Sequence, residues 1–401
     1  MSAATLNREM IDVLIVGAGI TGSLLALQLR DAGLNVHIIE AAAAPVHTLK
    51  PQNEYSLRVS AISPASVTAL QSVNAWRHLP QQRIMAYQRM TVWESHGAAE
   101  INFSATEIWQ DQLGFIIEND ELQLALLQEI NQSMAHTIHF ELQPLNYTIT
   151  DDAINVLLSN GETCRARLVI GADGARSPWR AAISSNLAMK SYFQKAIVAQ
   201  VRTEHAHQNT AWQRFLSGGP LAFLPLADGS SSIVWSLPQA QAAHYLAESE
   251  TEFCDALSRA LDFRLGKVLS CGTRAAFALQ HLHADHYVAP HVALIGDAAH
   301  VVHPLAGQGV NLGIADAVCL ADVLRVAAQQ NKKQLGDLSV LKRYEQQRRV
   351  MNATMSLALD GLHHLYINQH PLAIWLRNTG VNAIEHLPML KRLLMQQAMR
   401  T

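Results

Sequence analysis

Uninterrupted runs of mainly apolar residues occur at three places far apart in the chain. They occupy residues 11–16, 168–170 and 292–295, and a glycine follows each run directly. Strands covered on both faces of a parallel sheet have this composition, whereas half-exposed strands alternate polar and apolar residues. The runs therefore predict three buried strands, each ending in a tight turn.

Elsewhere the spacing of apolar residues is different. Residues 197–202 and 232–236 contain alternating runs, which are typical of an antiparallel sheet with one covered face. Residues 23–29 are expected to form a helix after the first buried strand, and the end of the chain, from Leu341 onward, is expected to be helical. The pattern predicts a mixed α/β protein with a separate antiparallel sheet.

A glycine-rich segment joins the first predicted strand to the first predicted helix. Gly17, Gly19 and Gly22 form the pattern G-x-G-x-x-G, which is informative in this strand–turn–helix context. Gly17 permits the tight turn, Gly19 lets the backbone approach a pyrophosphate, and Gly22 lets helix and strand pack closely. Glu40 ends the next predicted strand, where a carboxylate accepts hydrogen bonds from ribose hydroxyls. We predict a dinucleotide site, which this motif leaves open between FAD and NAD.

Aspartates follow the other two predicted buried strands. Asp173 belongs to the sequence Gly-Ala-Asp-Gly, and Asp297 belongs to Gly-Asp-Ala-Ala-His. Either motif taken alone is equally consistent with an ordinary turn. A loop containing Gly307 and Gly309 follows Asp297, and a helix is expected to begin near Asn311.

The order of these three motifs resembles that of the flavoprotein aromatic hydroxylases typified by para-hydroxybenzoate hydroxylase. The resemblance implies bound FAD, with Asp297 at its ribityl chain and Asp173 near its pyrophosphate and a transient nicotinamide site. It also implies that the loop around Gly307 lies against the flavin ring, with the positive end of the next helix pointing at the flavin. Because no second dinucleotide motif is found in the sequence, NADH or NADPH is expected to bind only transiently, as co-substrate.

Within that family, the chain is similar to the hydroxylases of ubiquinone biosynthesis. Matching sequence words lie at residues 57–63, 118–119, 222–226 and 296–313, and the similarity extends over nearly the whole chain. It implies an FAD-dependent monooxygenase that uses NAD(P)H and O2 to hydroxylate the aromatic ring of a polyprenylated phenol or benzoquinol.

The sequence does not decide which ring carbon is hydroxylated, and it leaves two other functions open. The tail and residues 233–236 favour a 2-polyprenylphenol C5 hydroxylase, whereas residues 211–213 favour a demethoxyubiquinol hydroxylase. A flavin-dependent reductase of isoprenoid substrates would share the same fold. So would a non-catalytic flavoprotein that acts as a scaffold in a ubiquinone-biosynthesis protein complex.

The resemblance also implies the domain organisation. The fold class is α/β, with a Rossmann-like FAD-binding domain, an inserted antiparallel-sheet substrate domain and a helical C-terminal region. The predicted FAD-binding domain is discontinuous and comprises residues 1–75, 95–180 and 268–330. The predicted substrate domain comprises residues 76–94 and 181–267, and the C-terminal helical region comprises residues 331–401.

Candidate site residues follow from the motifs and the resemblance together. The cofactor-binding candidates are Gly17, Gly19, Gly22, Glu40, Arg58, Gln123, Asp173, Asp297, Gly307, Gly309 and Asn311. The candidates for contact with an apolar substrate are Phe223, Leu224, Pro225 and Trp235, for which an ordinary place in the sheet core is the alternative. His303 is a candidate for catalysis on the substrate side, although a structural role fits it better, and no general base can be named. No metal site is predicted, because the histidines show no standard zinc spacing.

Composition and charge bear on the binding partners and the cellular location to expect. The formal net charge is −3 and the 30 Lys and Arg residues are dispersed, so nucleic-acid binding is not expected. Four cysteines far apart fit a reducing compartment. Neither a signal peptide nor a membrane-spanning apolar stretch is apparent, which predicts a cytoplasmic enzyme. The segment 374–399 mixes apolar with basic residues and is open between a packing helix and a surface that meets the inner membrane or a protein partner.

Overall fold

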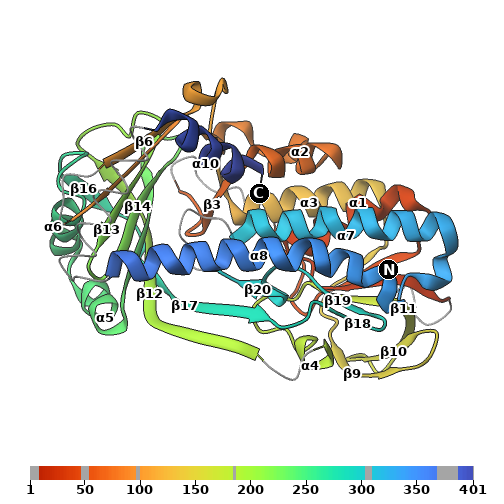
Figure 1. Cartoon of the computed structure of the whole chain (residues 1–401). Coiled ribbons are helices and arrows are strands. Elements are labelled where there is room, and N and C mark those ends of the chain that lie inside the picture. The colour runs from red at the N-terminus through yellow and green to blue at the C-terminus, as the bar shows by residue number, and fades with distance from the viewer. Residues whose placement is uncertain are drawn as a thin grey trace.

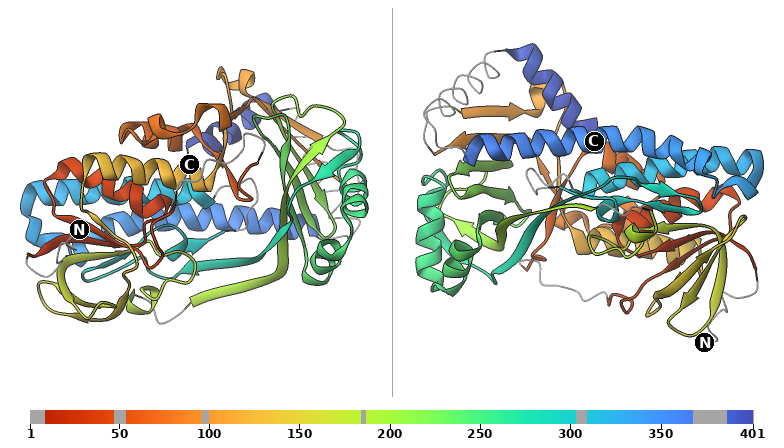
Figure 2. Two further views of the ribbon diagram at one scale, coloured as in Figure 1. Left: turned by 180° about the vertical axis from the view of Figure 1, so that it is seen from behind. Right: turned by 60° about the horizontal axis from the view of Figure 1, so that its bottom comes forward.

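The computed structural model describes residues 9–46, 54–95, 100–183, 187–302, 309–367 and 387–400. One end of the molecule combines a sheet with a layer of long helices, and a second sheet stands at the other end (Figure 1). The long helix α8 (Leu338–Ile367) runs across both parts (Figures 1 and 2). The predicted α/β class, with an antiparallel sheet and a helical C-terminal region, is confirmed.

The three predicted buried strands are neighbours in the first sheet. The strands of this sheet are β1 (Ile11–Val16), β2 (Val36–Ile39), β8 (Ile138–His139), β9 (Pro144–Ile149), β10 (Ile154–Leu158), β11 (Thr163–Gly171), β18 (Val288–Ala289) and β19 (Val292–Leu294). β1 pairs in parallel with both β2 and β11, and β11 pairs in parallel with β19. Because carboxyl ends of parallel strands meet at one edge, the loops that follow β1, β11 and β19 come together there.

Helices from three parts of the chain cover this sheet. They are α1 (Ile20–Leu29), α3 (Asn119–Ser133) and α7 (Gly309–Asn331). The central helix α1 contacts both α3 and α7. Apolar residues on all sides of α1 are buried, as expected for a helix enclosed by neighbours. This burial holds α1 in place, with its amino end directly after the glycine-rich loop.

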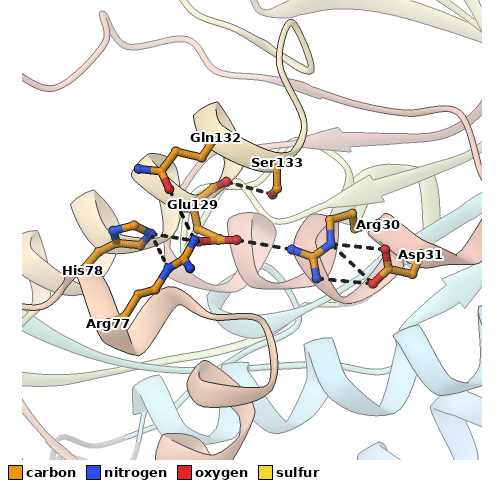
Figure 3. Close-up of polar contacts among 7 residues, drawn as sticks. All are labelled: Arg30, Asp31, Arg77, His78, Glu129, Gln132 and Ser133. Atoms are coloured by element: carbon orange, nitrogen blue, oxygen red, sulfur yellow. Dashed lines mark hydrogen bonds and ion pairs between the residues drawn. The ribbon is translucent and has the colours of Figure 1, made fainter.

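An ion cluster around the buried carboxylate of Glu129 joins α3 to two short helices (Figure 3). The carboxylate of Glu129 on α3 contacts Nη1 of Arg30 at 3.3 Å, Nη2 of Arg77 at 2.9 Å and Nε2 of His78 at 2.8 Å. Arg30 begins the short helix η1 (Arg30–Ala32) after α1, and Arg77 and His78 belong to η2 (Ala75–His78). The cluster therefore ties α3 to α1 and to the segment after α2 (Pro64–Ser72).

The second sheet is antiparallel except for one parallel pair, β5 with β13. Its strands are β5 (Arg89–Glu94), β6 (Glu100–Ser104), β12 (Leu187–Thr203), β13 (Thr210–Leu216), β14 (Gly219–Pro225), β15 (Ser231–Pro238), β16 (Val268–Cys271), β17 (Ala275–Ala284) and β20 (His300–Val301). β12 pairs with β15 in antiparallel register, as the alternating runs predict. Helices α5 (Gln239–Ala247) and α6 (Glu250–Ala260) pack against one face.

A small third sheet lies between the two parts of the molecule. It consists of β3 (Val59–Ile62), β4 (Met85–Tyr87) and β7 (Gly114–Glu118). The remaining helices are α4 (Arg180–Ile183) and α10 (Pro388–Arg400). β6, β16, β17 and β20 join the second sheet although their residues fall within the ranges expected for the FAD-binding domain. The domain boundaries stay a prediction.

Candidate functional site

The glycine-rich loop after β1 needs its glycines for steric reasons. Gly17 has a φ of 111°, and a Cβ there would lie 2.4 Å from the carbonyl oxygen of Ala172. A Cβ on Gly22 would lie 2.1 Å from the carbonyl oxygen of Gly17. Gly19 differs, because a Cβ there would meet nothing within 4 Å. Gly19 thus leaves open space at the amino end of α1, where free N–H groups bind phosphate oxygens.

Two predicted cofactor residues hold the peptide between these glycines from opposite sides. Oε2 of Glu40 accepts a hydrogen bond of 2.7 Å from the amide of Ala18. Nε2 of Gln123, on α3, donates a hydrogen bond of 2.9 Å to the carbonyl oxygen of Ala18. The sequence predicts that both residues lie near the cofactor, and the structure brings both to the glycine-rich loop. Their observed contacts fix the loop.

Asp173 follows β11, in the loop next to the glycine-rich one. Its Oδ1 atom is buried and has no hydrogen-bond partner in the described part of the chain. Burial raises the pKa of the Asp173 carboxyl. Buried polar atoms without a partner are rare in native proteins. The orphaned oxygen fits a site completed by a ligand hydroxyl or a bridging water.

Asp297 follows β19, in the short helix η5 (Gly296–Ala298). Protein atoms surround its carboxylate on most sides, and this burial raises the pKa of the carboxyl. The side chain is nevertheless accessible, because it forms part of the wall of a large cavity. Asp297 therefore presents an acceptor to whatever occupies that cavity.

The buried side chain of Arg180 links the two aspartate loops. Its guanidinium donates to the carbonyl oxygens of Gly174 and Ala175 in one loop. It also donates to the carbonyl oxygens of Asp297, at 3.4 Å, and Ala298, at 3.2 Å, in the other. Sequence analysis missed Arg180, although it lies soon after the Asp-Gly motif. The arginine holds the loops after β11 and β19 in a fixed relation.

The start of α7 is anchored by Asn311. Its Oδ1 accepts a hydrogen bond of 3.0 Å from the amide of Ser63, and its Nδ2 donates one of 2.8 Å to the carbonyl oxygen of Ala61. Asn311 also lines the cavity, and each end of its amide already has one partner in the protein. Gly309 opens onto empty space, since a Cβ there would meet nothing within 4 Å. The predicted residues Gly307 and His303 lie outside the described residues.

A network of buried polar groups supports η5 from behind. The carboxylate of Asp316 on α7 contacts Nε2 of His300 at 2.5 Å and Nε of Arg348 at 2.7 Å. It also accepts hydrogen bonds from the amide of Gly296 and from Nδ2 of Asn352, each at 3.1 Å. Burial alone would raise the pKa of Asp316, but His300 and Arg348 lower it to about 2. Sequence analysis singled out none of Asp316, Arg348 and Asn352.

A cavity of about 720 Å³ lies between the first part of the molecule and the second sheet. One side of its wall contains Arg58 just before β3, Ser60 on β3, Asn119 at the start of α3, Asp297 in η5, and Gly309 and Asn311 at the start of α7. On the other side, strands of the second sheet contribute mostly apolar residues, namely Met90, Phe103, Ala222, Leu224, Val234 and Phe277. The guanidinium of Arg58 lies 5.9 Å from the ring of Phe277. One cavity therefore joins four of the predicted cofactor residues to the mostly apolar face of the second sheet.

The structure places only one of the four predicted substrate residues in the cavity wall. Leu224 lines the cavity, but Phe223 and Trp235 point to the opposite face of the sheet and pack against α6. Alternate residues of a strand face opposite sides, and every residue from 222 to 226 is apolar, so the sequence did not reveal which ones face inward. Pro225 is not part of the cavity wall. On these two strands, Ala222 and Val234 line the cavity instead of Phe223 and Trp235.

Two polar residues in the cavity wall were missed by sequence analysis. Gln213 on β13 is only 7% exposed, yet its amide has no hydrogen-bond partner in the described part of the chain. Tyr87 on β4 is also in the wall, and burial raises its pKa to about 12. Its phenol is thus neutral near pH 7 and can donate a hydrogen bond. With Ser236 and Gln280, they are polar groups in a mostly apolar part of the wall.

Comparisons with known proteins agree with this arrangement. Residues 10–356 match the protein family described as FAD binding domain. The human protein named ubiquinone biosynthesis monooxygenase COQ6, mitochondrial, is 36% identical, and the match covers 96% of this chain and 91% of that protein. The 3-demethoxyubiquinol 3-hydroxylase of Escherichia coli strain K12 is 35% identical, with 98% of this chain and all of that protein covered.

Solved structures show the same fold at lower sequence identity. The Pseudomonas aeruginosa protein PqsL, in complex with 2-aminobenzoylacetate, aligns with a TM-score of 0.76 and 24% identity, covering 94% of this chain and 100% of that one. Klebsiella pneumoniae HpxO, complexed with FAD and uric acid, aligns with a TM-score of 0.72 and 18% identity, covering 96% of each chain.

Proposed function

The chain belongs to the FAD-binding family of aromatic-ring monooxygenases, and we propose that it hydroxylates a polyprenylated phenol or benzoquinol in ubiquinone biosynthesis. NAD(P)H and O2 would serve as co-substrates. The observation that carries this proposal is the single cavity that has Asp297 and Arg58 in one wall and an apolar sheet face in the other. Relatives named for ubiquinone biosynthesis, similar over more than nine-tenths of the chain, support the substrate class.

The residues of the first part fit FAD. We assign the pyrophosphate to the open space at Gly19 and the amino end of α1, with Glu40 and Gln123 holding the loop in shape. The orphaned Oδ1 of Asp173 and the accessible carboxylate of Asp297 are the acceptors for cofactor hydroxyls in this proposal. When bound there, FAD supplies the redox chemistry that activates O2 for transfer to the ring.

The residues of the sheet would hold the ring and exclude water. Ala222, Leu224 and Val234 give the cavity an apolar surface, which suits a polyprenylated substrate and lowers the access of bulk water to the reacting centre. We assign two polar groups of the cavity wall, Gln213 on the second sheet and Tyr87 on β4 of the third sheet, to the oxygen substituents of the ring. Hydrogen bonds from two points would fix the ring orientation and hence the carbon that is hydroxylated.

For the ring position, we favour C5 of a 2-polyprenylphenol, on the sequence words at residues 233–236 and in the tail. The alternative is the demethoxyubiquinol position, for which the Escherichia coli relative is named. We place the enzyme on the cytoplasmic side of the inner membrane. Within the described residues, no helix is long and apolar enough to cross a bilayer.

Steady-state oxidation of NADH and NADPH by the purified, FAD-loaded protein tests the proposal. Short-chain analogues of the 2-polyprenylphenol and of the demethoxyubiquinol are the substrates to compare. We expect one of them to stimulate oxidation and to yield a hydroxylated product, whose ring position is read by NMR. Reduction of an isoprenoid double bond without hydroxylation would support a reductase. Bound FAD without stimulated oxidation would support a scaffold.

A further inference from the structure

The chain segment 54–58, which has neither helix nor strand, leads into β3 and ends at Arg58. Among the described residues of the cavity wall, Arg58 alone is a lysine, arginine or histidine. Burial raises the pKa of the Asp297 carboxyl, and the charges of His300 and Arg58 oppose that rise. The position of the Arg58 guanidinium therefore influences the electrostatic potential inside the cavity.

A buried ion pair lies behind this segment. Nε of Arg83 contacts Oε2 of Glu118 at 2.7 Å, and Nη2 of Arg83 contacts Oε1 of Glu118 at 2.9 Å. Arg83 belongs to the short helix η3 (Gln81–Arg83), and Glu118 ends β7. Only 8% of the Arg83 side chain and 1% of the Glu118 side chain are exposed. The two parallel contacts fix the orientation of both side chains.

The ion pair also holds the backbone of the segment at two points. Oε1 of Glu118 accepts a hydrogen bond of 2.6 Å from the amide of Ser56. Nη2 of Arg83 donates one of 2.8 Å to the carbonyl oxygen of Glu54, and the same guanidinium lies 4.5 Å from the ring of Tyr55. Each partner of the ion pair therefore binds the segment directly, in addition to binding the other partner.

The residue after Glu118 completes the attachment. The amide of Asn119 donates a hydrogen bond of 3.0 Å to the carbonyl oxygen of Arg58. β3 pairs with β7 so that Val59 lies opposite Glu118. The contacts of Glu118 and Asn119 therefore set the place at which the exposed Arg58 side chain leaves the main chain.

We propose that Glu118 is a positioning residue, which together with Arg83 holds the Arg58 guanidinium at the cavity. The inference rests on the proposed function, in which FAD occupies the part of the cavity beside Arg58 and Asp297. Reduced flavin carries negative charge, and a cation fixed nearby stabilises that charge without having to reorganise. Glu118 is not part of the cavity wall, so it acts through Arg58.

The midpoint potential of the bound FAD, measured by dye equilibration without oxygen, tests this inference in the variant Glu118→Gln. Loss of the carboxylate charge weakens the hold on the segment, so the Arg58 guanidinium moves away from the flavin and reduction becomes harder. We expect the reduction equilibrium to fall roughly tenfold, a decrease of about 30 mV for a two-electron couple. Removing a negative charge has a direct effect of the opposite sign, so the direction of the shift separates the two causes.

A double-mutant cycle with Arg58→Met identifies the residue through which Glu118 acts. Arg58→Met alone should lower the potential at least as much as Glu118→Gln does. Adding Glu118→Gln to Arg58→Met should lower the potential no further, although it should reduce the urea midpoint equally in both backgrounds. An equal fall of the potential in both backgrounds would overturn the inference.

Two further variants separate positioning from a general loss of stability. The matched control is Glu129→Gln, which also removes a buried carboxylate bound to arginine side chains and should leave the potential unchanged. Arg83→Lys keeps the positive charge but loses the two-point contact, and it provides the test if Glu118→Gln does not fold. We expect a smaller fall of the potential in Arg83→Lys. Reduced stability with an unchanged potential in these Glu118 and Arg83 variants would overturn the inference.

The potential is measured without a phenol, which separates this inference from the proposed function. A protein that gives the expected cycle but hydroxylates no phenol would uphold the role of Glu118 and contradict the proposed function. Hydroxylation by the wild type, with a potential that Glu118→Gln leaves unchanged, would do the reverse. A protein that binds no FAD would contradict both.

Discussion

His300 and Asp316 form a buried pair beneath the loop that presents Asp297, with Nε2 of the ring 2.5 Å from the carboxylate. The low pKa of Asp316, about 2, keeps the carboxylate ionised, so the ring nitrogen donates. The same carboxylate binds the amide of Gly296, directly before Asp297. The geometry of the loop after β19 therefore depends on a residue of α7 that faces away from the cavity.

Replacing Asp316 with Asn should destabilise the protein and weaken FAD binding. Removing one member of a buried charged network leaves the others unpaired and costs about 3–5 kcal/mol of unfolding free energy. Urea denaturation and FAD titration measure the two effects. The control is Asp322→Asn on the same helix, because Asp322 is exposed and pairs only with half-buried Arg325 in the described structure. An unfolding free energy equal in both variants would contradict the role given to Asp316.

The same carboxylate predicts a pH dependence of stability. The folded pKa of Asp316 is lowered to about 2, below the ordinary value of about 3.9. Its contribution is therefore complete above pH ~4 and is lost as the pH falls toward ~2. Urea midpoints of the wild type should decline more steeply over this range than those of the variant Asp316→Asn. Parallel declines would assign the acid sensitivity to other carboxylates.

The ion cluster on Glu129 should stabilise the fold without affecting catalysis. Substitution Glu129→Gln removes the charge that faces Arg30, Arg77 and His78. We expect a loss of about 2–3 kcal/mol in unfolding free energy, as for a buried hydrogen-bonded charge, with kcat and KM unchanged at low temperature. Asp31→Asn, at an exposed position, is the control. A change in KM would indicate that the cluster also shapes the cavity.

Arg180 should matter for cofactor affinity because it holds two loops together. Substitution Arg180→Met keeps most of the side-chain volume and removes the donors to four carbonyl oxygens. Leaving such buried acceptors unpaired costs about 1–3 kcal/mol, and we expect FAD to dissociate roughly tenfold to a hundredfold more readily. Fluorescence titration with FAD measures this, with exposed Arg176→Met as the control. Unchanged affinity would show that the loops keep their positions without the arginine.

Substitutions on the two faces of the second sheet should have different effects. Gln213→Leu removes the polar group from the cavity wall, and we expect kcat/KM to fall roughly tenfold through loss of about 1.4 kcal/mol of hydrogen bonding to substrate. Phe223→Leu, on the opposite face, should lower stability and leave KM unchanged. Measuring product formed per NAD(P)H oxidised adds a readout of ring positioning. If Gln213→Leu lowered only stability and Phe223→Leu lowered kcat/KM, the ring would not contact Gln213.

Sequence analysis predicted the motif loops better than the cavity. Runs of apolar residues that end in glycine can hardly form anything except buried strands and tight turns, so β1, β11 and β19 followed directly. Asp316, Arg348 and Asn352 gave no comparable signal, because single polar residues in helices are usually exposed. Their burial depends on the packing of α7 against α8, which residue spacing does not specify.

The sequence did not predict which residues of the second sheet line the cavity, for a different reason. Residues 222–226 are all apolar, so nothing in the sequence separates Leu224, which lines the cavity, from Phe223, which packs against α6. The tail was expected to contain a helix with basic and apolar residues, and α10 is such a helix. That Met395 lines the cavity while Leu393 is exposed became visible only in the structure.

Oxygen labelling tests the central claim most directly. The FAD-loaded protein is incubated with NAD(P)H, a short-chain prenylphenol and ¹⁸O2, and the product is examined by mass spectrometry. A monooxygenase predicts a ring-hydroxylated product that carries one labelled oxygen atom from O2 and none when the label is supplied as H2¹⁸O. A product without the label, or oxidation of NAD(P)H that leaves the phenol unchanged, would contradict the assignment.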